Sequence, residues 1–329
     1  LSTYLIYYLS KNCTKGEIGL SSIFLSGAYV RLLCVKVYEE SVAIVVVLYK
    51  AELSLFHKDL LKNGNITLIV VDNTPGRDLD LRADRLVYIP LGDNLGIATA
   101  QNEGIGQARE SGCDYVIFFD QDSVIPEGYA NRMVEEYKRI NGLVPNLFLL
   151  GPTVTNGRTK EVYKSTIHRD VWAAEDFILR REIISSGSCV ALRKIEEVGL
   201  NDDYLFIDYV DFELCWRANN KGFVNGLTTN IKLIHYVGQQ EYRIFNQLVI
   251  ISAPIRYYYQ VRNYLWLIRR CYVPMQWKIN RAIKLIVFPI SFPFKVRCWR
   301  EIYVQMFRGV KDGLLDKRYG KSRSGNGVI

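Results

Sequence analysis

Aliphatic runs alternate with polar turns and helical stretches along residues 41–139. Continuous aliphatic runs are typical of parallel strands that are covered on both faces, and they occupy residues 42–48, 66–71, 86–89 and 115–119. Helical patterning follows or separates these runs, at residues 54–62, 98–111 and 126–139. Because strands and helices alternate, we predict an α/β fold with a Rossmann-like, mostly parallel sheet flanked by helices.

The second half of the chain has a different pattern. We predict strands at residues 148–154, 183–192 and 231–238, and an acidic, aromatic segment at residues 202–217. The chain then becomes aromatic, basic and helical. The pattern therefore predicts an extension of unassigned role (1–40), a catalytic domain (41–240), a C-terminal aromatic and basic helical region (241–316) and a flexible tail (317–329).

Charge and cysteine content narrow the function classes only a little. The 329 residues carry a formal net charge of +8, which indicates an anionic partner without choosing among nucleic acid, phosphate ligands and acidic membranes. The 7 cysteines include no C-x-x-C pair, so we expect buried reduced thiols rather than a zinc knuckle or a disulfide framework. No apolar run reaches the roughly 18 to 20 residues of a membrane span, so we expect none.

Acidic and amide side chains follow the predicted strands where a parallel sheet binds its ligands. Asp72 and Asn73 end the second strand, and Asp120-Gln121-Asp122 ends the fourth. Ligands of open α/β sheets lie beyond the carboxyl ends of the strands. Two carboxylates on one turn suit a hard divalent cation that keeps substrate phosphates in its coordination shell. The alternative interpretation of D-x-D alone is a solvated turn or a helix cap.

A second group of acids lies within apolar and aromatic surroundings. Asp208, Asp211 and Glu213 fall in Phe-Ile-Asp-Tyr-Val-Asp-Phe-Glu, where a carboxylate can act as a general base. The same acids also suit the N-terminus of a helix that continues to Arg217. His235 ends a predicted strand and is a plausible third metal ligand, although a lone histidine is more often a core residue.

Glycine and asparagine recur between the third strand and the following helix. Asn94, Gly96, Asn102 and Gly104 combine close backbone approach with amides that bond sugar or phosphate oxygens. The segment is neither a Walker loop nor a complete G-x-G-x-x-G fingerprint.

The order of these motifs along the chain resembles that of glycosyltransferase family 2, the inverting enzymes with the GT-A fold. The likeness is closest to the bacterial rhamnosyltransferase-like members of that family. The likeness covers about residues 42–238 and includes the form Asp-Gln-Asp-Ser. It implies donor-binding roles for Tyr49, Asp72, Asn94, Gly96, Asn102 and Asp120. On the acceptor side it implies roles for Ser186, Gly187 and Asp208. It implies metal ligation of Mg²⁺ or Mn²⁺ by Asp120, Asp122 and His235, and a catalytic base at Asp211.

The resemblance implies an inverting transfer of a sugar, with rhamnose from dTDP-rhamnose expected first, to a glycan or lipid-linked acceptor in cell-surface polysaccharide synthesis. Val210 stands where many members carry Glu, and Glu213 where many carry Asp. These departures leave open whether Asp208 takes a supporting role. Another donor, such as a UDP-sugar, and a non-catalytic nucleotide-sugar-binding scaffold remain as alternatives.

Two segments suggest contact with a membrane. Residues 255–270 and 284–300 interleave aromatic residues with cations, as do helices that bind acidic lipid surfaces. We therefore expect a cytoplasmic protein, peripheral to the inner face of the cell membrane. The alternative is an ordinary helical subdomain with its basic residues in solvent.

Two other classes fit less well. A nucleotidyltransferase would favour a glycine-rich loop with cations after the first strand, and none follows Tyr49. A nucleic-acid-binding protein would explain the basic charge but not the acids at the strand ends.

Overall fold

A computed structural model describes residues 20–25, 28–33, 40–51, 64–156, 170–235, 241–244 and 247–316 of the chain. The chain divides into two compact units, Leu1–Glu40 and Ser41–Ile329. In the first unit, β1 (Leu20–Leu25) and β2 (Ala28–Leu33) pair as an antiparallel hairpin, which the sequence pattern did not predict. The predicted helix at residues 54–62 and the predicted tail at 317–329 lie outside the described residues.

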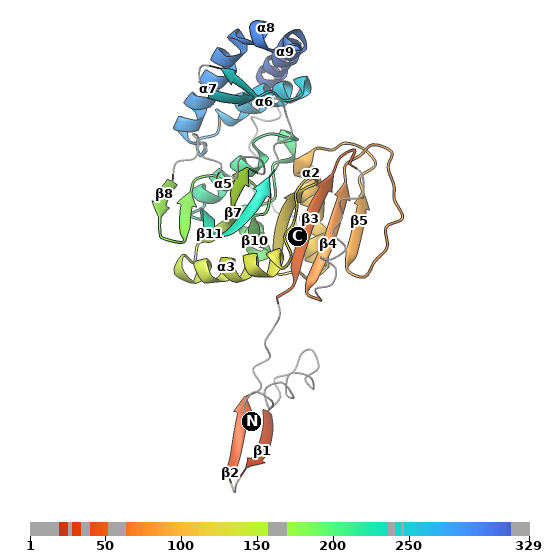
Figure 1. The fold of residues 1–329 in the computed structure, drawn as a ribbon, viewed down its shortest axis with the longest axis vertical. Coiled ribbons are helices and arrows are strands. Elements are labelled where there is room, and N and C mark those ends of the chain that lie inside the picture. The colour runs from red at the N-terminus through yellow and green to blue at the C-terminus, as the bar shows by residue number, and fades with distance from the viewer. Residues whose placement is uncertain are drawn as a thin grey trace. The chain divides into compact units, whose positions relative to one another are not determined.

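The second unit is organised around one large sheet (Figure 1). Within the described residues, it has nine strands in the order β5-β4-β3-β6-β10-β7-β11-β9-β8. The first-half strands are β3 (Val42–Leu48), β4 (Ile66–Asp72), β5 (Leu86–Pro90) and β6 (Tyr115–Asp120). The others are β7 (Leu147–Asn156), β8 (Asp170–Ala173), β9 (Phe177–Arg180), β10 (Cys189–Ala191) and β11 (Val224–His235).

Strand direction puts the polar strand ends on one edge of the sheet. Strands β3, β4, β5 and β6 run parallel to one another. Strand β10 is antiparallel to both β6 and β7, so β7 points the same way as β6, and β11 is parallel to β7. The carboxyl ends of β3, β4, β6, β7 and β11 therefore share one edge.

The sheet is buried on both faces because its central strands are aliphatic at every position. Every residue of β3 is buried. Its Val42, Ile44 and Val46 pack in one cluster with α3 (Tyr129–Leu143). Its other face packs in a second cluster with α2 (Ile97–Glu110), α4 (Leu192–Val198) and α5 (Val210–Asn220). The result is a three-layer α/β/α arrangement, which confirms the predicted fold class.

Four helices follow the sheet. They are α6 (Pro254–Leu267), α7 (Met275–Ile290), α8 (Phe292–Lys295) and α9 (Trp299–Leu315), preceded by a hairpin of β12 (Glu241–Ile244) and β13 (Gln247–Ile250). They lie at the top of the view in Figure 1, toward the edge where β3 ends. A cluster that includes Tyr209, Trp216, Trp266 and Trp277 joins α5, α6 and α7. In the described part of the chain, every helix is too short or too polar to cross a bilayer.

One predicted strand is largely wrong. Of residues 183–192, only Cys189–Ala191 form a strand. The preceding residues form a turn, in which Ser186 makes an isolated bridge to Phe118, and helix α4 begins at Leu192. The sequence pattern predicted a strand here because apolar residues flank the small residues 185–188. Among the cysteines within the described residues, Cys113, Cys189 and Cys215 are buried and free, as expected, whereas Cys271 is exposed.

The contact of α2 with β3 provides a test of the packing. A Cβ added at Gly104 would lie 2.4 Å from Val45 Cγ1, whereas one added at Gly106 meets nothing within 4 Å. We predict that Gly104→Ala lowers the free energy of unfolding by about 1–3 kcal/mol through overpacking. Gly106→Ala on the same helix should raise it by about 0.5–1 kcal/mol, because alanine favours a helix.

Urea denaturation of both variants measures the two effects. Equal destabilisation by the two substitutions, or none by either, would contradict the close approach of α2 to β3.

Candidate active site

Two acids flank the end of strand β3. In the strand register, Leu48 of β3 pairs with Asp72 of β4, and Val47 pairs with Asp120 of β6. The two acids are thus two strand spacings apart, roughly 10 Å. Asp72, Asp120 and the turns that follow them border one site at this edge.

Asp72 is fully buried, and its carboxylate already has partners. It accepts hydrogen bonds from Arg77 Nε at 2.5 Å, Tyr88 Oη at 2.8 Å and the Thr74 backbone N–H at 3.0 Å. Burial alone would raise the pKa of Asp72, but bonds from Arg77, Thr74 and Tyr88 hold it below its usual value. Burial and the same carboxylate raise the pKa of Tyr88 to about 12. Asp72 therefore fixes the turn after β4, and its donor-binding role remains a prediction.

Asn73 and Asn94 hold the next two turns together. Asn73 Nδ2 donates to Asn94 Oδ1 at 3.0 Å, and the Leu95 backbone N–H donates to Asn73 Oδ1 at 2.7 Å. Asn94 Oδ1 also accepts from the Gly96 backbone N–H at 3.2 Å. Gly96 has φ 88°, and a Cβ there would lie 2.6 Å from the carbonyl oxygen of Phe206. Only glycine fits at this position, because the backbone approaches so closely.

The Asp-Gln-Asp-Ser turn joins the predicted donor side to the predicted acceptor side. Gln121 Oε1 accepts from the Tyr49 backbone N–H at 2.7 Å, so the turn is tied to the end of β3. Ser123 Oγ lies 3.1 Å from Ser186 Oγ. Asp122 is exposed. The sequence analysis did not single out Gln121 or Ser123, because the contacts that give them their roles are long-range.

Ser186 and Gly187 are built into the sheet. The Gly187 backbone N–H donates to the Phe118 carbonyl at 2.7 Å, and the Gly187 carbonyl accepts from Tyr129 Oη at 2.7 Å. Gly187 has φ 77°, and a Cβ there would lie 2.7 Å from Tyr129 Oη. Both residues are buried. Ser186 and Gly187 therefore lie beside the Asp-Gln-Asp-Ser turn, in contact with Ser123 and Phe118. Direct contact of these residues with an acceptor remains a prediction.

A strained turn (residues 204–209) precedes Asp211. We call it the catalytic turn because it leads to the predicted base. Phe206, Asp208 and Tyr209 have positive φ values of 64°, 66° and 67°. Such a conformation costs about 1–3 kcal/mol for each non-glycine residue and persists only where neighbouring structure imposes it. Helix α5 begins at Val210, which places Asp211 in its first turn.

Asp208 within this turn pairs with an arginine of α6. Arg256 Nη2 lies 2.5 Å from Asp208 Oδ1, and Arg256 Nε lies 3.1 Å from Asp208 Oδ2. Burial acts to lower the pKa of Arg256, but Asp208, Tyr209 and Asp120 raise it above its usual value. The guanidinium is therefore within electrostatic reach of acids from both the catalytic turn and β6.

Further contacts from α6 hold the catalytic turn. Asn263 is fully buried, and its Nδ2 donates to the carbonyls of Leu205, Ile207 and Asp208 at 2.9, 2.8 and 3.2 Å. Arg262 Nη2 donates to the carbonyls of Tyr204 and Leu205. The rings of Tyr259 and Phe206 stack with centroids 4.6 Å apart. Several of the arginines and aromatic residues expected at a membrane thus hold the catalytic turn in place.

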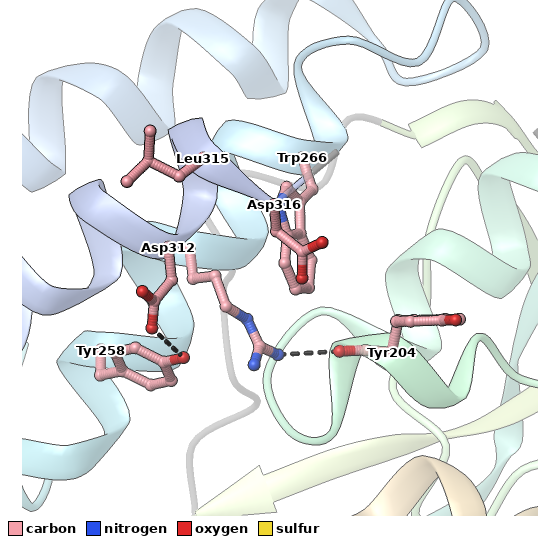
Figure 2. Close-up of a pocket in the computed structure, with 7 residues that line it drawn as sticks. Tyr204, Tyr258, Trp266, Asp312, Leu315 and Asp316 are labelled. Atoms are coloured by element: carbon pink, nitrogen blue, oxygen red, sulfur yellow. Dashed lines mark hydrogen bonds between the residues drawn. The ribbon is translucent and has the colours of Figure 1, made fainter. Parts of the chain in front are cut away.

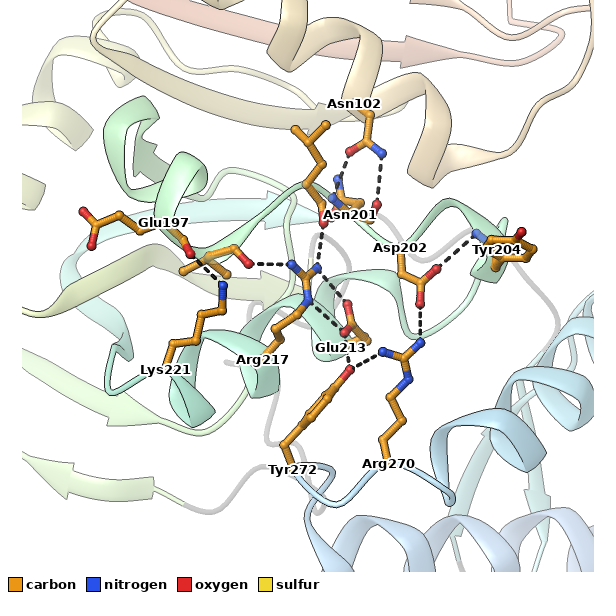
Figure 3. A network of polar contacts seen from close by, with 12 residues as sticks. Asn102, Glu197, Asn201, Asp202, Tyr204, Glu213, Arg217, Lys221, Arg270 and Tyr272 are labelled. Carbon is orange, nitrogen blue, oxygen red and sulfur yellow. Dashed lines mark hydrogen bonds and ion pairs between the residues drawn. The ribbon is translucent and has the colours of Figure 1, made fainter. Parts of the chain in front are cut away.

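Glu213 has a structural role in this chain. It is fully buried, forms an ion pair with Arg217 at 3.0 Å and accepts from Tyr272 Oη at 2.6 Å (Figure 3). Arg217 also donates to the carbonyls of Val198 and Leu200. Asp211, by contrast, is partly exposed. Of the two acids in this helical turn, Asp211 is the one that solvent or a substrate can reach.

Asn102 belongs to the same network. Its Nδ2 donates to the Asn201 carbonyl at 3.0 Å, and its Oδ1 accepts from the Asn201 backbone N–H at 2.9 Å (Figure 3). The amide therefore ties α2 to the segment that leads into the catalytic turn. Donor contact by Asn102 remains a prediction.

His235 ends β11, opposite Asn156 of β7, on the same sheet edge as Asp120. Its strand is three spacings from β6, roughly 14 Å. The His235 side chain lies outside the described residues, so metal ligation by it remains a prediction. Within the described residues, no three His, Cys, Asp or Glu side chains gather closely enough to hold a metal ion.

A cavity of about 470 Å³ lies behind the catalytic turn rather than at the strand ends. It is lined by Tyr204, Tyr258, Arg262, Trp266, Asp312, Leu315 and Asp316 (Figure 2). None of the site residues predicted from sequence lines it. The acids predicted to bind the donor and the metal lie at the ends of β4 and β6, so we place the candidate active site at that edge.

The brace supplied by Asn263 can be tested through stability. Asn263→Leu keeps the approximate volume of the side chain but leaves buried carbonyls without a donor, so we predict a loss of about 2–4 kcal/mol in the free energy of unfolding. Asn220→Leu is the matched control, because Asn220 is exposed at the end of α5. Chemical denaturation should separate the two variants clearly. Equal stability of both would show that Asn263 does not hold the catalytic turn.

Known proteins resemble this chain in sequence and in fold. The family model "Glycosyl transferase family 2" matches residues 35–181. The chain is 34% identical to the dTDP-rhamnosyl transferase RfbF of Shigella flexneri over 254 residues. This alignment covers 73% of this chain and 83% of RfbF. The fold is similar to GalNAc-T7 with UDP, GalNAc and Mn²⁺, with a TM-score of 0.52 and 12% identity.

That structural match covers 83% of this chain and 55% of the GalNAc-T7 chain, so this chain spans about half its length. S. aureus TarS 1-349 is similar with a TM-score of 0.48 and 12% identity, over 84% of this chain and 81% of that one. Two of the motifs that carry the resemblance, Asp72 and the Asp-Gln-Asp-Ser form, begin at the ends of β4 and β6. With the identity to RfbF over most of both chains, this shows that the chain belongs to glycosyl transferase family 2 and is a glycosyltransferase with the GT-A fold.

Proposed function

We propose that the protein transfers rhamnose from dTDP-rhamnose, with inversion, to a glycan or lipid-linked acceptor in cell-surface polysaccharide synthesis. The identity to a dTDP-rhamnosyl transferase supports the donor. The observation that carries the chemistry is the placement of Asp211 in the first turn of α5, after a strained turn that α6 braces. Strain retained beside a set of acids is typical of functional sites.

The donor nucleotide would bind at the ends of β3 and β4. Tyr49, Asp72, Asn94 and Gly96 border this place, and Asp120 lies on its other side. The Asp72 carboxylate is already hydrogen-bonded to Arg77 and Tyr88, so this cluster would form a rigid side of the nucleotide site. Asn102 would act by anchoring α2 to Asn201.

Asp120 and Asp122 suit a magnesium or manganese ion bound together with the donor. Asp120 ends strand β6 and is partly exposed, and Asp122 is exposed on the turn that follows. Such ions use one or two protein carboxylates and complete their shell with phosphate oxygens and water, so a larger protein cluster is unnecessary. His235 would add a ligand from the same edge. When bound, the ion supplies positive charge that stabilises the departing diphosphate.

Asp211 would be the general base. The acceptor hydroxyl gives its proton to the Asp211 carboxylate while its oxygen forms a bond to the anomeric carbon. The bond from that carbon to the diphosphate oxygen breaks, and its electron pair leaves with the diphosphate. A single displacement from the opposite face inverts the anomeric configuration. The N-terminal end of α5 stabilises the carboxylate before proton transfer.

Asp208, Ser186 and Gly187 would form the acceptor side. Asp208 is held by Arg256, so its role there is to position the catalytic turn and the acceptor cleft rather than to take the proton. The charge of Asp120 also helps to raise the pKa of Arg256. Because the acceptor is expected to be lipid-linked, we propose peripheral contact with the inner face of the cell membrane.

Substitution of the base tests the mechanism directly. Asp211→Asn should lower transfer by about 10²–10⁴-fold with little change in stability, because it removes the proton acceptor. Asp203→Asn, the same change at an exposed acid of the neighbouring 3-10 helix (Asp203–Leu205), should keep full activity. Released nucleoside diphosphate is measured with dTDP-rhamnose and a panel of UDP-sugars. Equal activity of the two variants would exclude Asp211 as the base.

Removal of the metal gives an independent test. A chelator should abolish nucleoside diphosphate release, and Mg²⁺ or Mn²⁺ should restore it. Asp122→Asn should raise the metal concentration needed for half-maximal rate, because one carboxylate ligand is lost. Full activity in the chelator would show that the two acids do not act through a metal. Donor binding without release in the wild-type protein would favour the scaffold alternative.

A further inference from the structure

Helix α7 presents an apolar surface to solvent along its length. The positions of this helix that are exposed are all large and apolar, and each is at least half exposed: Met275, Ile279, Ile283, Ile286 and Ile290. We refer to these five residues as the α7 stripe. Their spacing of three and four residues places them on one side of the helix.

The opposite side of α7 carries its polar and aromatic residues toward the protein. Lys278 Nζ donates to the carbonyls of Ile268 and Arg270 at 2.9 and 2.8 Å. The Arg281 guanidinium lies 4.8 Å from the centroid of the Tyr209 ring, and Trp277 is buried. These contacts fix the rotation of the helix, so the α7 stripe cannot turn into the core.

Apolar residues are also exposed directly after this helix. Phe294 of α8 is 87% exposed, and Pro293 beside it is also exposed. Scattered apolar residues are normal on a protein surface, but a continuous apolar face marks a binding surface. In α7 the apolar side faces solvent and the polar side faces the protein, so the stripe with its four isoleucines indicates a binding partner.

The charge around this surface is positive. The sequence has no Asp or Glu between Glu241 and Glu301. Arg297 and Arg300 are exposed directly after α8, and Arg308 and Lys311 are exposed on α9. Anionic lipid head groups provide the complementary charge, and each cation near such a surface contributes about 1 kcal/mol.

A second copy of the chain fits this surface less well. A symmetric interface brings each patch against itself, so Arg297 and Arg300 would approach the same cations of the partner. Residues 242–300 contain no acid that could pair with them, and the first acid after them is the exposed Glu301. An anionic bilayer satisfies both the apolar stripe and the cations.

We propose that the α7 stripe and Phe294 dock on an anionic bilayer surface, with α7 lying in the plane of the interface. The helix has 16 residues, about 24 Å at 1.5 Å per residue, and is too short to span. This deepens the peripheral contact included in the proposed function. Of the two segments expected at a membrane, it keeps the second, which overlaps α7 and α8, and not the first, which forms α6. Through Arg281 and Tyr209, the docked helix also contacts the catalytic turn, so a lipid-linked acceptor would arrive beside Asp211.

Vesicle co-sedimentation of the full chain tests the proposal without any donor or acceptor. We expect the wild-type protein to bind vesicles of phosphatidylcholine with roughly a third phosphatidylglycerol, and to bind less in high salt or to phosphatidylcholine alone. Ile283→Gln with Ile286→Gln should lower the partition coefficient by at least about tenfold. Arg297→Gln with Arg300→Gln should weaken binding to the anionic vesicles only.

The matched control is Leu143→Gln with Val171→Gln, since both residues are about equally exposed outside the C-terminal helices. It should bind like the wild type, and thermal unfolding should show that all variants are folded. No vesicle binding by the wild type, or equal binding by the α7 variant, would overturn the proposal. So would a wild-type dimer in solution that the α7 variant converts to a monomer, because the surface would then join two copies.

The outcome is separable from that of the proposed function. Asp211→Asn should bind vesicles like the wild type, because the α7 stripe is unchanged. If vesicle binding fails while nucleoside diphosphate release persists, the docking surface is wrong and the transferase stands. If binding holds while no donor gives release, the transferase proposal fails and the docking surface stands.

Discussion

The site depends on a backbone turn that would not hold its shape alone. Phe206, Asp208 and Tyr209 all adopt positive φ without being glycine, and Asp211 follows directly in the first turn of α5. Helix α6 imposes the conformation through the Asn263 amide and the Arg256–Asp208 ion pair. The carboxylate proposed as the base is therefore positioned by a helix that lies outside the sheet. This explains why the C-terminal helices belong to the same compact unit as the sheet.

The same turn connects the proposed donor side of the site to the proposed acceptor side. The carbonyl of Phe206 lies against Gly96, where any side chain would collide with it. Asn102 of α2 is bonded at both ends of its amide to Asn201, shortly before the turn. Ser123 and Ser186 make a second connection, next to the acids proposed to bind a metal. A displacement of the donor loops would therefore reach the base through few, short and direct contacts, which suits a reaction that needs both substrates aligned.

Sequence reasoning predicted the parts of the fold in which local pattern and tertiary structure agree. The aliphatic runs predicted β3, β4, β5 and β6 to within about a residue, because strands buried on both faces have few alternatives. Sequence reasoning failed for side chains whose role depends on a hydrogen-bond partner far away in the sequence. Arg262 and Asn263 read as interfacial residues, yet their partners are carbonyls more than 50 positions earlier. Glu213 looked like part of the acidic site, but Arg217 and Tyr272 bury it. The hairpin of residues 20–33 carried no clear period at all.

The stereochemistry of the product tests the central claim most directly, namely that Asp211 drives a single displacement at the anomeric carbon. The purified protein would be incubated with dTDP-rhamnose, a divalent metal and a membrane lipid extract, and the anomeric configuration of the transferred sugar determined by NMR. The account predicts a configuration opposite to that of the donor. Retention of the donor's configuration would require two displacements or a different attack geometry, and would contradict the role given to Asp211 and to the turn that presents it.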